Sequence, residues 1–165
     1  MVGHISDEEY QIILENSIIS AVDAVIYNDK GQIFLAKRTQ EPCKGMWWIP
    51  GGRQNKGEMP EEAVIRKIKG ETGLDIEVER MIHTDDVIFD ETPFPNVKTG
   101  VHYVARVYLA RLKDSSQKVA LDQTQKEYFW ADKEWFEENK KTLHPYMLRS
   151  LLSSGVFDLY CKRGF

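Results

Sequence analysis

The segment between Pro50 and Leu74 constrains the fold more than any other part of this sequence. The triplet Pro50-Gly51-Gly52 predicts a break in any regular element, because proline and glycine are the strongest local interrupters of helices and strands. Pro60, followed by two glutamates, predicts a helix start, since proline suits the first helical position and acids favour the positive end of the helix dipole. Gly73 stands where a left-handed cap would end that helix.

Apolar and β-branched runs on both sides of this helix predict strands. They lie near residues 19–28, 32–37, 75–89, 100–112 and 126–131. Further helices are predicted at residues 7–17, where Ser6 and Glu9 have capping-box spacing, and within residues 132–152. Because strands and helices rarely alternate in this order, the pattern favours an α+β fold, with a curved mixed sheet packed between helices, over a doubly wound parallel sheet.

Length, charge and cysteine use limit the class of protein. A chain of 165 residues without repeats predicts one domain over residues 1–165, with the helices at 7–17 and 132–152 as extensions. The formal net charge of -4 provides no basic field for a nucleic acid, and no apolar run is long enough to span a membrane. Cys43 and Cys161 form no C-x-x-C pair and no secretory leader precedes them, which predicts free thiols in a cytoplasmic, unprocessed protein.

A longer motif lies within the constraining segment. It runs Gly52, five residues, Glu58, seven residues, Arg66-Lys67-Ile68, one residue, Gly70-Glu71, one residue and Gly73-Leu74. This spacing resembles the Nudix box, the loop-helix-loop signature of enzymes that act on a nucleoside diphosphate linked to another moiety. The resemblance implies a Nudix-like α/β/α sandwich. Lys67 and Gly70 depart from it, because the family pattern has glutamate at both positions.

Residues 67, 70 and 71 share one face of the predicted helix, given its 3.6-residue period. Three carboxylates there would form an oxygen-rich site for Mg²⁺ or Mn²⁺, whereas this chain has a lysine, a glycine and one glutamate. Lys67 and Glu71 are also spaced as i and i+4, so a surface ion pair is a second interpretation. Glu58 and Arg66 are predicted to form another ion pair, which would hold the loop on the helix.

Asp23 is the one acid in the apolar run at residues 19–28. A charged side chain on an interior strand is costly unless it is paired, hydrogen-bonded or close to a metal, which makes Asp23 a candidate site residue. The alternative is a solvated position, because the strand side that carries Asp23 could face water.

Asp23 lies on the first predicted strand, Arg38 follows the second and Arg53 follows the glycine pair. In these residues the chain also resembles GDP-mannose mannosyl hydrolases. These are Nudix enzymes that attack the anomeric carbon of the sugar instead of a phosphorus atom. The resemblance covers roughly residues 17–131 and includes Tyr103. It implies that Arg38, Arg53 and Tyr103 bind and stabilise the departing diphosphate, and that Asp23 supports the positive charge developing on the sugar.

The same resemblance implies a metal site. Glu71 and the backbone carbonyl of Gly51 would bind Mg²⁺, or Mn²⁺ in its place, and Gln125 would be a further ligand. In the direct alignment Gln125 stands where these relatives have a histidine general base and Thr124 stands where they have the ligand. A one-residue shift of the loop would make Gln123 or Gln125 the ligand.

Three possibilities stay open for the general base. Asp122 or Glu127 serves as the base, a histidine such as His83 or His102 reaches the site from elsewhere in the chain, or the reaction is a different one.

Three functions are compatible with these residues. The first is Mg²⁺-dependent hydrolysis of a nucleoside diphosphate sugar, GDP-mannose-like, that releases nucleoside diphosphate and sugar by attack at the anomeric carbon. The second is a Nudix pyrophosphatase on a nucleoside diphosphate derivative, and the third is a catalytically weak nucleotide-binding module. A homodimer is expected, both from the resemblance and from the apolar segments Tyr146-Met147-Leu148 and Val156-Phe157. No nucleic acid or membrane partner is expected.

Overall fold

The computed structural model describes the backbone of residues 5–161 and the side chains of residues 5–158. The elements follow one another as α1 (Asp7–Asn16), β1 (Ile19–Tyr27), β2 (Ile33–Arg38), β3 (Trp47–Trp48), β4 (Gly51–Arg53), α2 (Pro60–Thr72), β5 (Ile76–Phe89), β6 (Val101–Leu112), β7 (Gln125–Ala131), α3 (Lys133–Asn139), α4 (Pro145–Ser154) and α5 (Val156–Cys161).

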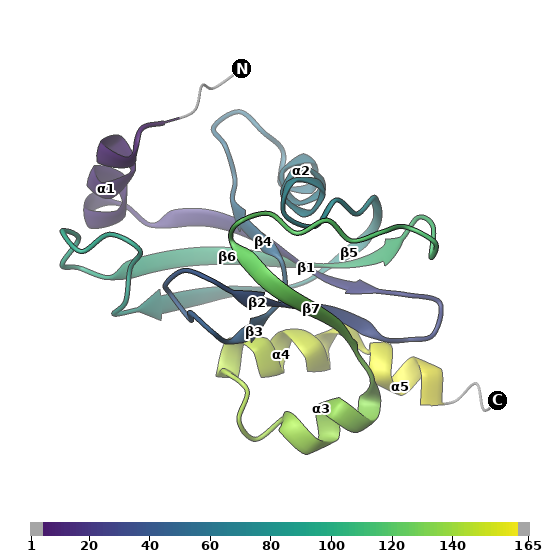
Figure 1. Ribbon diagram of the computed structural model, residues 1–165. Helices are drawn as coiled ribbons and strands as arrows, with labels where there is room; N and C mark the ends of the chain where they lie inside the picture. Colours follow the sequence, from purple (N-terminus) through teal and green to yellow (C-terminus); the bar gives the residue numbers. More distant parts are fainter. Residues whose placement is uncertain (1–4, 162–165) are drawn as a thin grey trace.

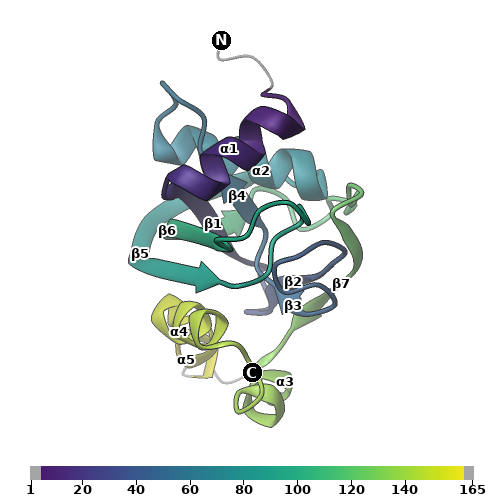
Figure 2. The same cartoon turned by 90° about the vertical axis from the view of Figure 1, so that its left-hand side faces the viewer.

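In the described part of the chain, seven strands form one mixed sheet between two layers of helices (Figure 1). The strand order is β3-β2-β1-β6-β5, with β4 beside β1 and β7 beside β2. β1 and β6 run parallel, and the other paired strands run antiparallel. Helices α1 and α2 lie on one side of the sheet, and α3, α4 and α5 lie on the other, as the view in Figure 2 also shows. The predicted α+β fold, a mixed sheet between helices, is confirmed.

The side chains of β1 divide between two apolar cores. Val22 and Ala24 belong to the core under α2, whereas Ala21 and Val25 belong to the core that includes α4. Because successive strand residues point to opposite faces, Asp23 points to the α4 side. One carboxyl group is thereby placed in an otherwise apolar layer.

The helix ends follow the local sequence signals. Ser6 and Glu9 form the predicted capping box at the start of α1, each side chain bonding the backbone N–H of the other residue. Pro60 is the first residue of α2, and Gly73 ends that helix in the left-handed conformation, with φ 72°. Both predictions are confirmed, and α1 ends one residue earlier than the predicted 7–17.

The predicted break at Pro50-Gly51-Gly52 is confirmed at Pro50, which lies between β3 and β4 and in neither, and is wrong at the two glycines. Gly51 begins β4, which pairs antiparallel with β1 so that Gly51 lies opposite Asp23. A Cβ atom on Gly51 would lie 1.9 Å from Asp23 Oδ1 and 2.3 Å from the carbonyl oxygen of Val22. Glycine here permits close strand pairing instead of ending the strand. The sequence also gave no prediction of β3 or α5, since elements of two to six residues show too little periodicity.

The apolar C-terminal residues proposed for a dimer surface pack inside the chain. Tyr146, Met147, Val156 and Phe157 are between 0 and 7% exposed and belong to the core that includes α4. They are therefore not available to a second copy, and that reason for dimerisation is wrong. The homodimer itself stays a prediction.

The single domain predicted for residues 1–165 also stays a prediction, and residues 1–4 and 162–165 lie outside the described part. Within residues 5–161, no helix has both the length and the apolar character needed to cross a membrane.

Candidate active site

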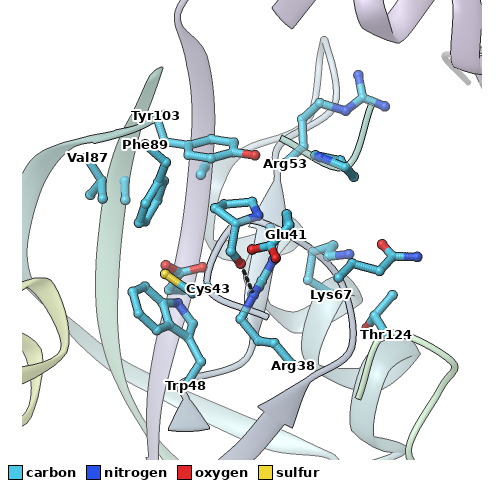
Figure 3. A pocket seen from close by; sticks show the side chains of 18 of the residues that line it. Arg38, Glu41, Cys43, Trp48, Arg53, Lys67, Val87, Phe89, Tyr103 and Thr124 are labelled. Atoms are coloured by element: carbon cyan, nitrogen blue, oxygen red, sulfur yellow. Dashed lines mark hydrogen bonds between the residues drawn. The ribbon is translucent and has the colours of Figure 1, made fainter. Parts of the chain in front are cut away.

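All the residues predicted for the site line one cavity (Figure 3). Its volume is about 470 Å³, within the range of roughly 300–1,000 Å³ usual for small-molecule sites. The predicted residues on its wall are Asp23, Arg38, Gly51, Arg53, Glu71, Tyr103 and Gln125. They come from β1, β2, β4, α2, β6 and β7, so the mixed sheet and one helix bring together residues distant in sequence. Their individual roles stay predictions.

The cavity has a cationic side and an aromatic side. In Figure 3, Arg38, Arg53 and Lys67 lie along one side, and Trp48 and Phe89 lie along the other. The Trp48 ring is buried and stacks on Tyr146 with centroids 5.5 Å apart. Such a cavity can accept a molecule that is anionic at one end and flat or apolar at the other.

Asp23 forms part of the cavity wall beneath α4. Its Oδ2 accepts a hydrogen bond from the Tyr146 hydroxyl. Burial, together with the nearby Glu71 carboxylate, raises the pKa of Asp23 from 3.8 to about 7, against the opposing effects of the Tyr146 hydrogen bond and the Arg38 charge. Because this side of β1 packs against α4, the solvated position considered from the sequence does not apply. A carboxyl group that ionises near neutrality in a cavity is a candidate for a functional role.

Glu71 is only 6% exposed, and both of its carboxylate oxygens have partners. Oε1 lies 2.7 Å from Lys67 Nζ, and Oε2 accepts a hydrogen bond from the Gly51 N–H at 3.2 Å. Burial raises the pKa of Glu71, and the Lys67 ammonium and the Gly51 N–H oppose that rise. The ion pair predicted from the i,i+4 spacing is present, but it lies in the cavity wall and not on the surface.

The residues around Glu71 do not fit a Mg²⁺ ion as they are arranged. One oxygen of Glu71 faces the Lys67 ammonium and the other accepts from the Gly51 N–H, so the ammonium charge would repel a second cation at this carboxylate. Among the described residues, no three His, Cys, Asp or Glu side chains form a group that could hold a metal ion. Magnesium prefers several hard oxygen ligands, carboxylates above all.

Gln125 is the one predicted ligand with a free acceptor. Its Oε1 is buried without a hydrogen-bond partner in the described structure, and the residue lines the cavity. A neutral amide oxygen does not replace the missing carboxylates, but it can accept a hydrogen bond from a ligand. Its role as a metal ligand stays a prediction.

Arg38 and Arg53 approach the cavity from the ends of β2 and β4. The Arg38 Nε–H donates to the carbonyl of Pro42 at 2.7 Å, which holds the guanidinium at the cavity wall. The Arg53 guanidinium lies over the Tyr10 ring of α1, 5.3 Å from its centroid. Burial raises the pKa of Tyr103, and the adjacent Tyr10 adds to the rise, so its hydroxyl stays protonated and can donate a hydrogen bond.

The base candidates lie outside the cavity wall described here. His83 Nε2 lies 3.1 Å from Ser150 Oγ, and His102 Nε2 lies 2.9 Å from Asp86 Oδ1. Asp122 accepts hydrogen bonds within its own turn, and Glu127 forms ion pairs with surface lysines. None of these candidates is supported as the base by its position.

A second ion pair on α2 has a structural role. The Arg66 guanidinium donates two hydrogen bonds to Glu58, at 2.6 and 2.8 Å, and a third to the carbonyl of Arg53. The predicted Glu58–Arg66 pair is confirmed, and it ties the loop after β4 to the helix.

Sequence reasoning missed several residues of the cavity, and three of them, Tyr10, Lys67 and Tyr146, have polar groups that bear on the site. Lys67 appeared only as a departure from the motif or as half of a surface ion pair. Tyr10 and Tyr146 come from the first and fourth helices, and no local pattern connects them with Asp23. The signal that existed was Asp23 itself, because a lone acid on an apolar strand requires a polar partner from elsewhere.

The NUDIX domain family matches residues 18–151 of the chain. The Low-salt glycan biosynthesis protein Agl8 of Haloferax volcanii is 29% identical over 147 residues, which is 89% of this chain and 88% of that protein. An ADP-ribose pyrophosphatase of Methanocaldococcus jannaschii is 45% identical over 67 residues, 41% of this chain and 38% of that protein.

Among solved structures, the MutT protein of Methanosarcina mazei superposes with a TM-score of 0.63 at 23% identity, over 91% of this chain and 97% of that one. This likeness supports the fold alone. Since the family match spans most of the sequence, the chain belongs to the Nudix family of hydrolases.

Proposed function

We propose that this protein hydrolyses a nucleoside diphosphate sugar of the GDP-mannose type, releasing nucleoside diphosphate and free sugar by attack at the anomeric carbon. The observation that carries the proposal is that Arg38, Arg53 and Tyr103 line the same cavity as Asp23. Cationic and hydrogen-bonding groups are thus available for a diphosphate, and a carboxyl group is available for the sugar.

The chemistry requires charge separation between these two ends. The water oxygen forms a bond to the anomeric carbon, and the bond from that carbon to the diphosphate oxygen breaks, with its electron pair moving to the diphosphate. Negative charge therefore grows on the leaving group, where arginine presents a bidentate fork to phosphate oxygens. Positive charge grows on the sugar ring, and an ionised Asp23 would stabilise it.

The proton released from water has no histidine acceptor on the described cavity wall. A well-placed general base contributes roughly 10²–10⁴-fold to a rate. We therefore expect slow turnover, with Asp23, once ionised, among the acidic groups of the cavity that could accept the proton.

Two similarities bear on the choice of reaction. Agl8, similar over most of the chain, is by its name a protein of glycan biosynthesis, which favours a sugar-linked substrate. The similarity of a shorter region to an ADP-ribose pyrophosphatase keeps cleavage between phosphates as the second candidate function. A catalytically weak nucleotide-binding module is the outcome if neither cleavage occurs.

The remaining parts of the proposal come from the resemblance. Nudix hydrolases in general use Mg²⁺ or Mn²⁺, and the resemblance extends that requirement to this chain. The contacts of Glu71 speak against it, so no step above depends on a metal ion. A cytoplasmic location and a homodimer are likewise part of the proposal.

The experiment is a product analysis in ¹⁸O-labelled water. The protein is incubated with GDP-mannose, GDP-glucose or ADP-ribose, each with and without Mg²⁺. The products are separated, and mass spectrometry determines which of them carries the label. The expected result is nucleoside diphosphate without label and sugar that carries it. Nucleoside monophosphate with sugar phosphate would establish the pyrophosphatase instead. If no substrate is cleaved but a nucleotide raises the melting temperature, the binding module is the correct function.

A further inference from the structure

Lys67 lies at the position where a cation would meet Glu71. It leaves α2 one turn before Glu71, and its ammonium is 2.7 Å from Glu71 Oε1. The side chain is 26% exposed and lines the cavity, so the ammonium reaches both the buried carboxylate and the cavity space. An ammonium group has three N–H donors, and the pair with Glu71 leaves donors available to a ligand.

Gly52 makes this position possible. A Cβ atom at Gly52 would lie 2.6 Å from Lys67 Cε and 3.1 Å from Nζ. The backbone there has φ 146°, in the region that favours glycine. The Lys67 side chain therefore extends from α2 and packs directly against the backbone of Gly52 in β4, where any larger residue would displace it.

The positive charge at this position acts on the rest of the cavity. The Lys67 ammonium lies close enough to Asp23, Glu71 and Tyr10 to act on the ionisation of each. With Arg38 and Arg53 it gives the cavity three cationic side chains. Since Glu71 already has an ammonium partner, a divalent cation would have to displace Lys67 to reach that carboxylate.

We propose that the Lys67 ammonium replaces the divalent cation at the phosphate position of this cavity, so that the protein binds a diphosphate without metal. The inference rests on the proposed function in one respect, that the cavity accepts a diphosphate. Glu71 then holds the ammonium in place, and Lys67 with the two arginines contacts the phosphate oxygens.

The first test measures binding of inorganic pyrophosphate by isothermal titration calorimetry. The full chain is titrated once in EDTA and once in excess Mg²⁺. The expected result is binding in EDTA, with an affinity within about threefold of that in Mg²⁺. Binding that requires Mg²⁺, or no binding in either buffer, would overturn the proposal.

The second test compares two lysines of the same helix. Lys67→Gln is expected to weaken pyrophosphate binding in EDTA by roughly tenfold or more, the usual effect of losing a hydrogen bond from a charged group. Lys69→Gln removes the same charge from an exposed residue that pairs with Asp75, and is expected to leave the affinity unchanged. Equal effects of the two substitutions would contradict a specific role for Lys67. Circular dichroism checks folding, and the double variant Lys67→Gln/Glu71→Gln, which leaves no unpaired buried charge, replaces the single variant if that one unfolds.

The third test is electron paramagnetic resonance of added Mn²⁺. The wild-type protein is expected to show no bound signal at Glu71, whereas Lys67→Glu, which supplies a second carboxylate, should bind Mn²⁺. A bound signal in the wild type that Glu71→Gln abolishes would show a metal site and overturn the proposal.

These results are separable from those of the product analysis. A protein that cleaves nucleotide sugars only with Mg²⁺ retains the proposed function and loses this inference. A protein that binds pyrophosphate in EDTA but cleaves no nucleotide sugar retains this inference and loses the proposed function.

Discussion

Two of the ion pairs formed by helix α2 differ in their surroundings. Glu58–Arg66 joins a loop to the exposed side of the helix, with the arginine side chain 41% exposed. Lys67–Glu71 lies in the cavity wall, with the carboxylate almost fully buried. The i,i+4 spacing predicts the contact of Lys67 with Glu71, but it does not predict the burial of that pair, which sets the cost of removing one partner.

The largest expected effect comes from removing the cation of the buried pair. Lys67→Met should destabilise the protein by about 3 kcal/mol at pH 8, because a buried carboxylate left without its partner typically costs about 3–5 kcal/mol and Lys67 is partly exposed. Urea denaturation measures the difference. The matched control is Lys67→Met/Glu71→Gln, in which no charge is left unpaired and most of the stability should return. A single variant as stable as the wild type would show that Glu71 is better solvated than its burial indicates.

A smaller effect should come from Asp23, a buried carboxyl group hydrogen-bonded to Tyr146. Its pKa of about 7 in the folded protein exceeds the ordinary value of 3.8, so the folded state binds a proton that the unfolded state has lost between these values. Protonated Asp23 therefore makes its full contribution to the free energy of unfolding below about pH 4. This contribution decreases as the pH rises and is lost above about pH 7. Between pH 5 and pH 8 the unfolding free energy of the wild type should decrease by roughly 2–3 kcal/mol more than that of Asp23→Asn, which has no carboxyl group to ionise.

The measurement for Asp23 is urea denaturation of both proteins at pH 5 and pH 8. Wild type and variant with parallel pH dependence would mean that Asp23 ionises normally. Turnover of the variant should fall most at pH 8, where the wild-type Asp23 is ionised, and the difference should be smaller at pH 5, where the wild-type group is mostly protonated.

The smallest effect concerns the exposed pair. Arg66→Gln should cost about 1–2 kcal/mol of stability, the range for charge-assisted hydrogen bonds at a partly exposed site. Pyrophosphate affinity should stay close to that of the wild type, because Arg66 does not line the cavity among the described residues. Denaturation and calorimetry on the same samples provide both numbers. A loss of affinity larger than the loss of stability would remove the distinction between the two pairs.

Local signals in the sequence predicted the helix from Pro60 to Gly73, the capping box of α1 and the strands β1 and β2. Such signals succeed because a cap or an apolar run depends on neighbours in the chain. Arg38, Arg53 and Tyr103 were instead implied by the family resemblance, and their roles stay predictions.

The short strand β4 was missed, since its glycines read as interrupters until the partner strand is known. Lys67 could be placed on the right face of the helix, but its contact with the cavity depends on Gly52, a residue of another element. Tyr146 could not be connected with Asp23, because 123 positions separate them.

That separation also bears on the order in which the chain acquires its site. Residues near the start of the sequence, Tyr10 and Asp23, meet Tyr146 only when the last helices have been synthesised and have docked. Until then Asp23 is exposed to water and ionised as in a free peptide, and its burial is a late event of folding. A ribosome-bound chain that lacks α4 would therefore have the strands and the motif helix but an open, hydrated cavity. The ability to bind a ligand would appear only after α4 has been synthesised and has packed against β1.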